Sequence, residues 1–113
     1  MNCIFCKIAE NKVPARIIYQ DDEILAFHDI APQAPYHVLL IPRKHISTLN
    51  DAEESDTEIL GKILLRSQLI AAQLGLSESG YRLVMNCNKN GGQSIYHIHC
   101  HLLGGRRMHW PPG

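Results

Sequence analysis

The sequence predicts an α+β domain with a mostly antiparallel sheet of about five strands, one long helix and a short N-terminal helix. The chain has 113 residues, the length of one domain, and we expect residues 1–113 to form a single one. Hydrophobic residues make up 45% and charged residues 19%, an ordinary globular balance. The apolar segments follow as two strands, a third strand, a long helix and two final strands. This order favours antiparallel pairing, with the helices on one face of the sheet.

The first quarter of the chain predicts a helix followed by a hairpin. We expect residues 3–10 to form a short helix that ends before Pro14. Residues 16–20 and 23–29 are apolar segments of strand length, separated by the acidic pair at positions 21 and 22. A tight turn at this pair makes the two strands a hairpin.

The next apolar segment predicts the centre of the sheet. Residues 31–35 contain two prolines, and each proline removes a backbone donor, so the sheet is interrupted there. Residues 37–41 then form a continuous apolar run that Pro42 closes. An uninterrupted run of this length is typical of a strand covered on both faces.

The second half predicts the long helix and two further strands. Asp51 or Ser55 is available as a helix cap, and Gly75 is a plausible helix end. Between them, from residue 57 to residue 74, apolar side chains recur at helical spacing; they are Ile59, Leu60, Ile63, Leu64, Ile70, Ala71 and Leu74. Residues 82–86 and 97–103 are the last two predicted strands.

Composition excludes several functional classes. The formal net charge is zero and the pI is about 7.0, so a strong electrostatic grip on nucleic acid is not expected. No stretch approaches the roughly 20 apolar residues of a membrane span, and no basic-then-apolar leader is visible. The four cysteines, at positions 3, 6, 87 and 100, then favour thiols or metal ligands over a disulfide framework. We expect a cytoplasmic protein.

The most informative segment is the alternating histidine motif at residues 97–103. In a strand, His97, His99 and His101 share one face. Just upstream, residues 90–94 form a glycine-containing loop that can bring backbone N–H groups close to an anion. This combination suits a phosphate substrate, with one imidazole as nucleophile and another handling a proton. The alternatives are a solvated strand face or a metal site.

The same motif resembles the signature of the histidine triad (HIT) superfamily. Residues 27–35, Gly92-Gln93-Ser94 and the ending at 104–113 are similar to its histidine triad nucleotide-binding (Hint) branch. The similarity covers nearly the whole chain. It implies the HIT fold and a purine nucleoside phosphoramidase that cleaves the P–N bond of adenosine 5′-phosphoramidates through a nucleotidyl-histidine intermediate.

The resemblance also implies roles for the triad and its loop. His99 corresponds to the nucleophile, and a backbone carbonyl near His97 fixes its tautomer. His101 is expected to contact a phosphate oxygen. Ser94 corresponds to a hydroxyl near the leaving nitrogen. Asn86 and the backbone of Gly92 and Gln93 are expected to hold the phosphate.

The nucleoside pocket implied by the resemblance comes from the first half. Asp29 is expected to accept both ribose hydroxyls, and Phe27, Ile30 and Val13 to enclose the purine. The alternatives are that Phe27 and Ile30 are core residues and that Asp29 is only a turn former. His37 lies behind the base pocket by the resemblance, although a structural role is equally open.

Cys3 and Cys6 have the spacing of two ligands of a structural zinc site, which needs two more. By the resemblance to some bacterial HIT proteins, the other two ligands are His45 and His97. The alternative is two thiols that pack as small hydrophobic groups. In either case the chemistry needs no metal.

Other functions and assemblies remain open. A dinucleoside polyphosphate hydrolase uses the same nucleophile, and a nucleotide-binding or protein-interaction module with incidental turnover is the third candidate. About five strands under one long helix leave a strand edge and a sheet face unprotected. The Hint-like pattern implies a homodimer, in which residues 108–113 reach the partner's active site and Trp110 helps select the leaving group.

Overall fold

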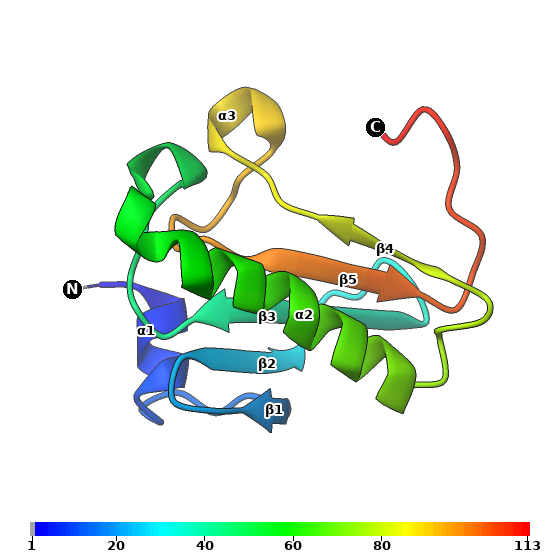
Figure 1. Cartoon of the computed structure of the whole chain (residues 1–113), viewed down its shortest axis with the longest axis horizontal. Coiled ribbons are helices and arrows are strands. Elements are labelled where there is room, and N and C mark those ends of the chain that lie inside the picture. Colours follow the sequence, from blue (N-terminus) through cyan, green and yellow to red (C-terminus); the bar gives the residue numbers. More distant parts are fainter. Residues whose placement is uncertain (1) are drawn as a thin grey trace.

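In the computed structural model, which describes residues 2–113, five strands form one antiparallel sheet (Figure 1). The strands are β1 (Ile17–Gln20), β2 (Ile24–His28), β3 (Tyr36–Pro42), β4 (Tyr81–Val84) and β5 (Cys100–Gly104), in the order β1-β2-β3-β5-β4. The predicted central strand therefore is central, with β2 and β5 as its neighbours. The predicted fold class is confirmed.

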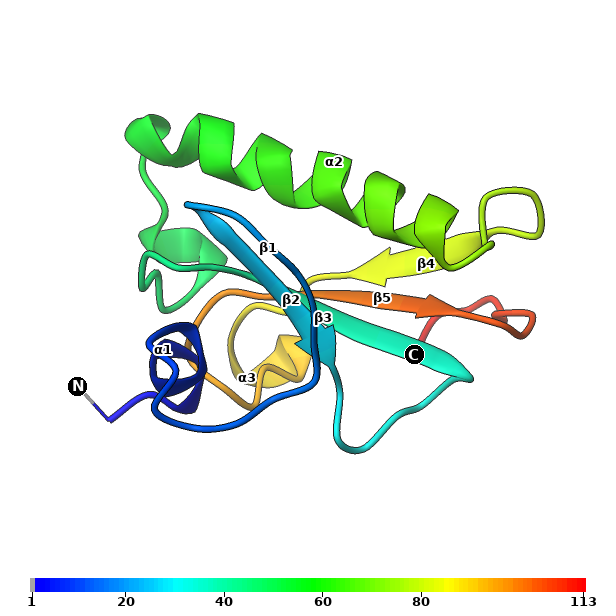
Figure 2. The same cartoon turned by 90° about the horizontal axis from the view of Figure 1, so that it is seen from below.

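Two helices cover opposite faces of this sheet. The long helix α2 (Thr57–Gln73) lies across one face, and the short helix α1 (Ile4–Ala9) lies on the other (Figure 2). The prediction that the helices share one face is therefore wrong. The physical reason is that α1 carries its own apolar residues, Phe5 and Ile8, and these pack on the alternate side chains of β2 and β3.

The face under α2 is a closed core. In β2, β3 and β5, side chains at even-numbered positions point toward α2 because successive side chains alternate faces. The fully enclosed members of this cluster are Ile24, Ala26, Val38, Leu40, Leu102, Ile63, Ile70 and Ala71. The space between α2 and this face of the sheet is therefore filled by core side chains.

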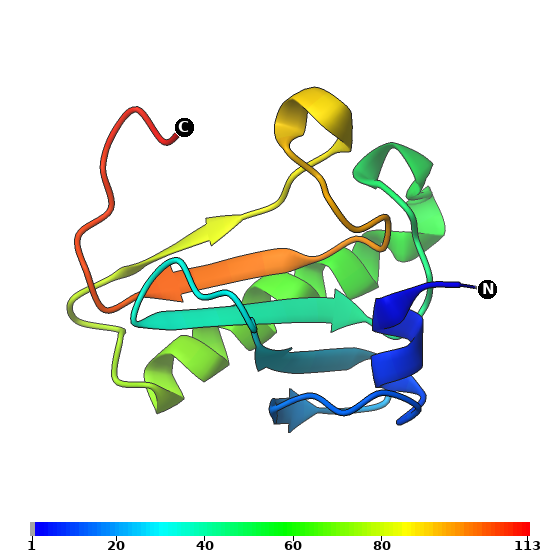
Figure 3. The ribbon, with the colours of Figure 1, turned by 180° about the vertical axis from the view of Figure 1, so that it is seen from behind.

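The opposite face is only partly covered. Leu25, Phe27, Leu39 and Ile41 form a second cluster beneath α1. Figure 3 shows that α1 covers one end of this face and leaves the middle and the far end of β3 and β5 without a helix. This face therefore has less helix over it than the face under α2.

The predicted hairpin is confirmed, with Asp21 as its turn residue. β1 and β2 pair antiparallel, with an irregularity in register between Ile17 and Tyr19. Asp21 Oδ1 accepts hydrogen bonds from the backbone N–H groups of Glu23 and Ile24, at 2.8 and 2.7 Å. The turn is fixed by a side chain that replaces a backbone acceptor.

The long helix agrees with the sequence except at its start. It begins at Thr57 after Asp56, so neither Asp51 nor Ser55 is its N-cap. Both lie in short 3₁₀ turns, at Leu49–Asp51 and Glu54–Asp56, that precede the helix. The predicted end is confirmed, since Gly75 has the positive φ of 77° that glycine adopts most readily after a helix. Among the described residues, no helix has the length and apolarity to cross a membrane.

Three predicted boundaries near the histidines are wrong. β5 begins at Cys100, so His97 and His99 precede the strand. β4 ends at Val84, which places Asn86 beyond it. The predicted loop at 90–94 begins inside a one-turn helix, α3 (Asn88–Gly91). At the two strands the side-chain pattern extends beyond the backbone pairing, because alternation reports faces and not hydrogen bonds.

Candidate active site and metal centre

The triad histidines lie on the partly covered face, and their rings separate into two groups. His99 and His101 are neighbours, with ring centroids 5.0 Å apart. His97 is fully buried and its ring turns toward α1. The antiparallel pairing of Leu39 with His101 places the last triad member in the middle of the sheet. His99 and His101 are thus the two histidines that can meet a substrate. His97 is enclosed by the protein.

His99 is held in one tautomer by the backbone. Its Nδ1 lies 2.8 Å from the carbonyl oxygen of His97, and a carbonyl only accepts, so Nδ1–H is the donor. The lone pair of the neutral ring is therefore on Nε2. The Phe5 ring meets His99 edge-on at a centroid distance of 5.2 Å, which restricts rotation of the imidazole. This is the arrangement that a nucleophilic imidazole needs.

His101 takes its tautomer from a chain of three side chains. The backbone N–H of Gln33 donates to His37 Nδ1 at 3.0 Å, so the proton of neutral His37 is on Nε2. His37 Nε2 lies 2.9 Å from His101 Nδ1 and 3.4 Å from Asp29 Oδ2. His101 Nδ1 then accepts, and its own proton is on Nε2. His101 can present an N–H donor to a phosphate oxygen.

Burial keeps this pair of rings neutral. It lowers the pKa of His101 to about 4, and the nearby His99 and His37 rings lower it further, whereas Asp29 opposes the shift. Burial likewise lowers the pKa of His37. Both rings are therefore uncharged at neutral pH, and the tautomers above are the relevant states.

A second cluster joins α1 to the loop after β3. The side chains of Cys3, Cys6, His45 and His97 bring their ligand atoms within 4.8 Å of one another. His97 Nδ1 lies 3.5 Å from each cysteine sulfur. His45 Nδ1 lies 3.3 Å from Cys6 Sγ and 3.2 Å from His97 Nδ1. These four residues are the predicted metal ligands, and the fold brings them together.

The geometry of this cluster fits a zinc ion. In a regular tetrahedron, Zn–S bonds of about 2.3 Å and Zn–N bonds of about 2.05 Å separate two nitrogens by about 3.3 Å and nitrogen from sulfur by about 3.5 Å. The cluster has separations of 3.2 Å between nitrogens and 3.3–3.5 Å between nitrogen and sulfur. The donor set, two thiols and two imidazoles, is one that zinc prefers.

The tautomers of this cluster also suit a metal. His97 Nε2 donates to the carbonyl oxygen of Pro42 at 2.7 Å, so its Nδ1 lone pair faces the other ligands. Ser47 Oγ lies 3.1 Å from His45 Nε2 and can hold that ring in the same way. Burial and the neighbouring Cys3 raise the pKa of the Cys6 thiol to about 11, so a cation binding here must displace a proton.

The group formed by Asp29, His37 and His101 has the residue types of a metal site but the wrong tautomer. Gln33 donates to His37 Nδ1, which leaves a proton on the nitrogen that would have to bind the ion. This group is therefore a hydrogen-bond chain. In the zinc-type cluster the backbone binds Nε2 of His97 and leaves Nδ1 for a metal. In this group the backbone binds Nδ1 of His37, and Nε2 carries the proton.

The loop before the triad is ordered by Gln93. Its side-chain Nε2 donates to the carbonyls of Ser47 and Ile95, at 2.8 and 3.1 Å, and its Oε1 accepts from the backbone of Asn88. The N–H groups of Gly92 and Gln93 donate to carbonyls within α3. These two amides therefore shape the loop, and their expected contact with phosphate would require this turn to open.

Two other polar residues of this region are placed differently. Ser94 is exposed, at the end of the loop. Asn86 is half-buried, and extending the pairing of Val84 with His101 by two residues places Asn86 opposite His99. Asn86 therefore lies beside His99, whereas Ser94 is placed only at the end of the loop that precedes the triad.

The structure separates the residues expected around the nucleoside. Phe27 is buried with Phe5, at a ring distance of 5.5 Å, and Val13 packs on the same cluster, so both belong to the core. Ile30 is fully exposed and therefore free to cover a base. Asp29 accepts from the backbone of Ala31 through Oδ1, so it is a turn former as well as a neighbour of His37.

His37 is the site residue whose role the sequence left open. It is buried, and it connects Asp29 to His101. The signal was present in the period of β3, because positions 37 and 39 share a face and Leu39 pairs with His101. The roles of Ser47 and the Pro42 carbonyl carry no signal in the sequence, since both depend on contacts between distant loops.

Comparisons with known proteins agree with this geometry. A family model described as the HIT domain matches residues 10–108. The chain is 50% identical over 112 residues to the adenylylsulfatase HINT1 of Arabidopsis thaliana, covering 97% of this chain and 76% of that protein. It is 51% identical over 112 residues to a 14 kDa zinc-binding protein of Brassica juncea, covering 97% and 98% of the two chains.

Two solved structures have the same fold. A HIT family hydrolase from Legionella pneumophila Philadelphia 1 superposes with a TM-score of 0.98 at 59% identity, covering 99% of this chain and 100% of that one. A Zn-bound histidine triad family protein from Mycobacterium smegmatis superposes with a TM-score of 0.82 at 34% identity, covering 94% and 76%.

Proposed function

This chain belongs to the HIT domain family and is a hydrolase that acts on nucleotides, and we propose that its substrates are purine nucleoside 5′-phosphoramidates. The expected membership of the Hint branch is confirmed. The observation that carries the proposal is the fixed tautomer of His99, whose Nδ1–H donates to the His97 carbonyl. A neutral imidazole held in this way can attack phosphorus through Nε2 without first losing a proton.

The reaction we propose has two displacements. His99 Nε2 attacks the phosphorus, the P–N bond breaks, and the amine leaves with a proton that passes to it by way of the Ser94 hydroxyl from solvent. Water then attacks the nucleotidyl-histidine, which releases the nucleoside monophosphate and restores His99. Dividing one substitution into two lowers the barrier of each.

The other polar groups stabilise charge on the phosphate. His101 Nε2–H donates to a non-bridging oxygen, and the chain through His37 keeps that proton in place. Asn86, which lies opposite His99, offers its side-chain amide to the phosphate. Asp29 takes the ribose hydroxyls through the acceptor positions that Ala31 and His37 leave, and Ile30 covers the purine.

The test is a comparison of substrates. We expect an adenosine 5′-phosphoramidate to give a higher kcat/KM than either a diadenosine polyphosphate or adenylyl sulfate. Faster turnover of the polyphosphate would favour the dinucleoside hydrolase. Faster turnover of adenylyl sulfate would favour the activity in the name of the Arabidopsis relative. Nucleotide binding with no turnover of all three would identify a binding module.

We further propose that Cys3, Cys6, His45 and His97 bind a structural zinc ion. The four-atom geometry and the Nε2–H contact of His97 support this, as does the similarity to the zinc-binding protein of Brassica juncea. When bound, the ion supplies a crosslink between α1 and the loop after β3. It takes no part in the displacement, which the histidines and Ser94 carry out.

Zinc content checks this second proposal. Purified protein is expected to contain about one zinc per chain, the stoichiometry of a four-ligand site. The Cys3→Ser, Cys6→Ser double variant should lose the metal and melt at a lower temperature, while Cys87→Ser should keep both properties. Wild-type protein that has no metal and the same Tm as the double variant would eliminate a zinc site.

We also propose that the chain is a homodimer. The outer side of α2 exposes Leu64, Leu65 and Leu69, which are 55%, 60% and 41% accessible, and β4 leaves a free sheet edge beside Tyr81. Apolar residues in a row beside an open edge favour association with a second copy of the same surface.

A further inference from the structure

We propose that the Cys3, Cys6, His45 and His97 cluster positions the nucleophile, so that occupancy of this metal site controls the orientation of His99. This inference rests on the proposed function and on the proposed zinc site. It assigns to the cluster a role in catalysis in addition to its crosslink. The cysteines and His45 are then positioning residues, since none of them reaches the substrate.

His97 is the residue that connects the two sites. Its ring is fully buried, with Nδ1 in the cluster and Nε2–H bound to the Pro42 carbonyl at 2.7 Å. Its own carbonyl oxygen accepts the Nδ1–H of His99 at 2.8 Å. A rotation of the His97 backbone therefore changes the acceptor that fixes the nucleophile's tautomer and plane.

The backbone around His97 is held by contacts outside the sheet ladder and by the buried side chain of Ile98. β5 begins only at Cys100, so the sheet ladder does not hold residues 97–99. The backbone N–H of Ile98 donates to the carbonyl of Ile46 at 2.7 Å, and Ile46 directly follows His45. Two contacts of this segment, those of His97 Nδ1 and of the Ile98 amide, therefore lead to the cluster or to the residue beside it.

Helix α1 gives a second connection. Cys3 and Cys6 lie at its first turn, and Phe5 lies between them in the sequence. The Phe5 ring meets His99 edge-on at 5.2 Å and His97 at 5.9 Å. Fixing the two sulfurs fixes α1, and α1 places Phe5 against the imidazole that must stay aligned with phosphorus.

The magnitude follows from the precision that displacement at phosphorus requires. A shift of about 1 Å in a reacting group can cost about a hundredfold in rate, and loss of an orienting partner typically costs about tenfold to a hundredfold. Binding of the nucleoside should change little, because the ribose and base contacts come from Asp29 and Ile30, on the loop between β2 and β3. The predicted signature is therefore a change in kcat without a matching change in nucleotide affinity.

The experiment compares zinc-loaded protein with protein stripped by a chelator, at a temperature where both remain folded. We expect the single-turnover rate of His99 nucleotidylation to fall by about tenfold to a hundredfold. The Kd for AMP should stay within about twofold, a change of less than about 0.5 kcal/mol. The ¹⁵N NMR signal of the His99 Nδ1–H should shift or broaden, and adding zinc back should restore both the signal and the rate.

A core variant provides the control for stability. Ile70 belongs to α2 and packs in the core on the opposite face of the sheet, so Ile70→Val lowers the Tm without touching α1 or the cluster. It should leave the His99 signal and the nucleotidylation rate unchanged. Cys6→Ser should reproduce the effect of the chelator, and where it fails to fold, the chelated wild type decides.

The proposal is overturned if stripped protein keeps both its rate and its His99 signal, if Ile70→Val reproduces the effect, or if purified protein binds no zinc. Failure of the proposed function is a separate result. If zinc-loaded protein does not turn over any phosphoramidate, the substrate assignment fails. The NMR comparison still decides the coupling, because the His99 signal does not depend on the substrate.

Discussion

At the scale of single residues, the site is defined by which nitrogen of each histidine the backbone occupies. The His97 carbonyl holds Nδ1–H of His99, the Pro42 carbonyl holds Nε2–H of His97, and the Gln33 amide occupies Nδ1 of His37. These backbone contacts give three histidines different roles. His99 is the proposed nucleophile, His97 a proposed metal ligand, and His37 the relay, the residue that connects Asp29 to His101. Residue identity alone does not distinguish the three roles.

Substitution of His37 tests the relay. His37→Asn removes the donor to His101 Nδ1, so His101 is no longer confined to the tautomer that presents Nε2–H. We expect kcat to fall by about tenfold to a hundredfold, with a smaller change in KM. Steady-state kinetics with an adenosine phosphoramidate measure both. His28→Asn, on the other face of β2, is the matched control, and an equal loss in the two variants would contradict a relay.

The pH dependence of stability follows from the same buried rings. Well above their ordinary pKa of about 6.5, these histidines are neutral whether the chain is folded or unfolded, and they contribute no pH dependence. Burial lowers the pKa of His37, and it lowers that of His101 to about 4. As the pH falls, these rings therefore bind protons in the unfolded chain before they do so in the folded chain. The free energy of unfolding should therefore fall as the pH drops from about 6.5 to about 4.

Urea unfolding at several pH values checks this expectation. Burial also lowers the pKa of His28 and His97, so His101→Gln removes one of several titrating rings, and its stability should depend less steeply on pH in this window than that of the wild type. His109→Gln, in the exposed tail, should follow the wild type. Asp21 does not interfere, because its lowered pKa affects stability only below the ordinary carboxyl range, about pH 3.9. A flat wild-type profile would contradict neutral buried rings.

At the level of helices and strands, the two faces of the sheet have different roles. The face under α2 contributes stability, and the opposite face carries the histidines of the proposed site. Ile63→Ala removes a fully buried side chain between α2 and the sheet and should cost about 2–5 kcal/mol of unfolding free energy. Activity per folded molecule should be retained, since the histidines lie on the other face. Denaturant unfolding and active-site titration measure the two quantities. Gln68→Ala, on the exposed side of α2, should change stability by less than about 0.5 kcal/mol.

The elements also show what the sequence could and could not predict. The hairpin, β3 and α2 were predictable because turn residues and periodicity are local. The starting point of β5 was not, because the apolar alternation begins at His97 and the backbone ladder begins at Cys100. The position of α1 was not either, since its apolar residues can pack on whichever face is open.

The sequence could predict which residues form the candidate site better than it could predict the hydrogen bonds between them. The triad motif and the Cys-x-x-Cys spacing indicate residues that the fold does bring together, in the cluster of Cys3, Cys6, His45 and His97. The carbonyl of Pro42 and the amide of Gln33 select the tautomers, and they act across loops far apart in the sequence. Such contacts leave no pattern in the chain.

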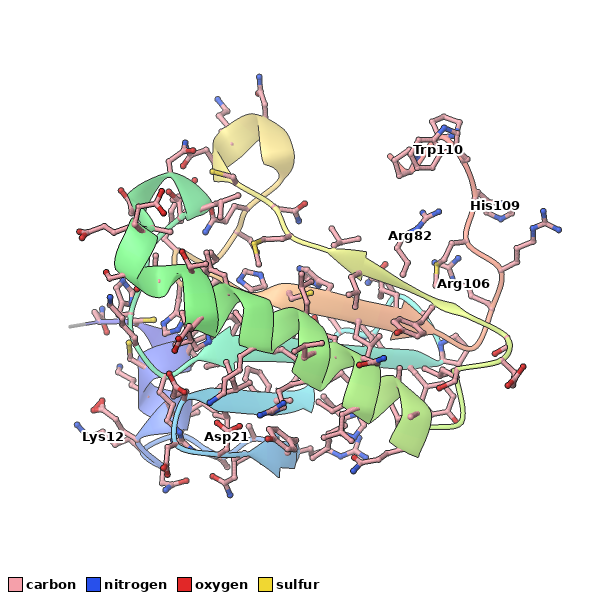
Figure 4. All side chains as sticks on the ribbon, in the orientation of Figure 1. Lys12, Asp21, Arg82, Arg106, His109 and Trp110 are labelled. Atoms are coloured by element: carbon pink, nitrogen blue, oxygen red, sulfur yellow. The ribbon has the colours of Figure 1, made fainter. Side chains whose placement is uncertain are left out.

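At the scale of the whole molecule, the C-terminal tail extends away from the core. Arg82 Nη2 donates to the carbonyl of His109 at 2.9 Å, which ties the tail to β4, and Trp110 projects beyond it, 83% exposed (Figure 4). An exposed tryptophan on a proline-stiffened tail suits a contact with a second subunit. In the proposed homodimer this contact lies at the partner's site.

Deleting residues 108–113 tests that arrangement. We expect the preference among leaving amines to change by more than the affinity for the nucleoside monophosphate, because the tail is proposed to meet the amine and not the nucleoside. Kinetics with a series of phosphoramidates and AMP binding measure the two effects. Light scattering on the wild type should give a dimer at micromolar concentration. A monomer, or unchanged amine selectivity after the deletion, would contradict the arrangement.

The nucleophile is identified by locating the nucleotidylated residue in the trapped intermediate. Wild-type protein mixed with an adenosine phosphoramidate is denatured in alkali within one turnover, and its peptides are analysed by mass spectrometry. We expect one adenylyl group on His99, and no adduct with His99→Ala, whose activity should fall by orders of magnitude although it still binds AMP. An adenylyl group on His97 or His101, with His99 unmodified, would contradict the account.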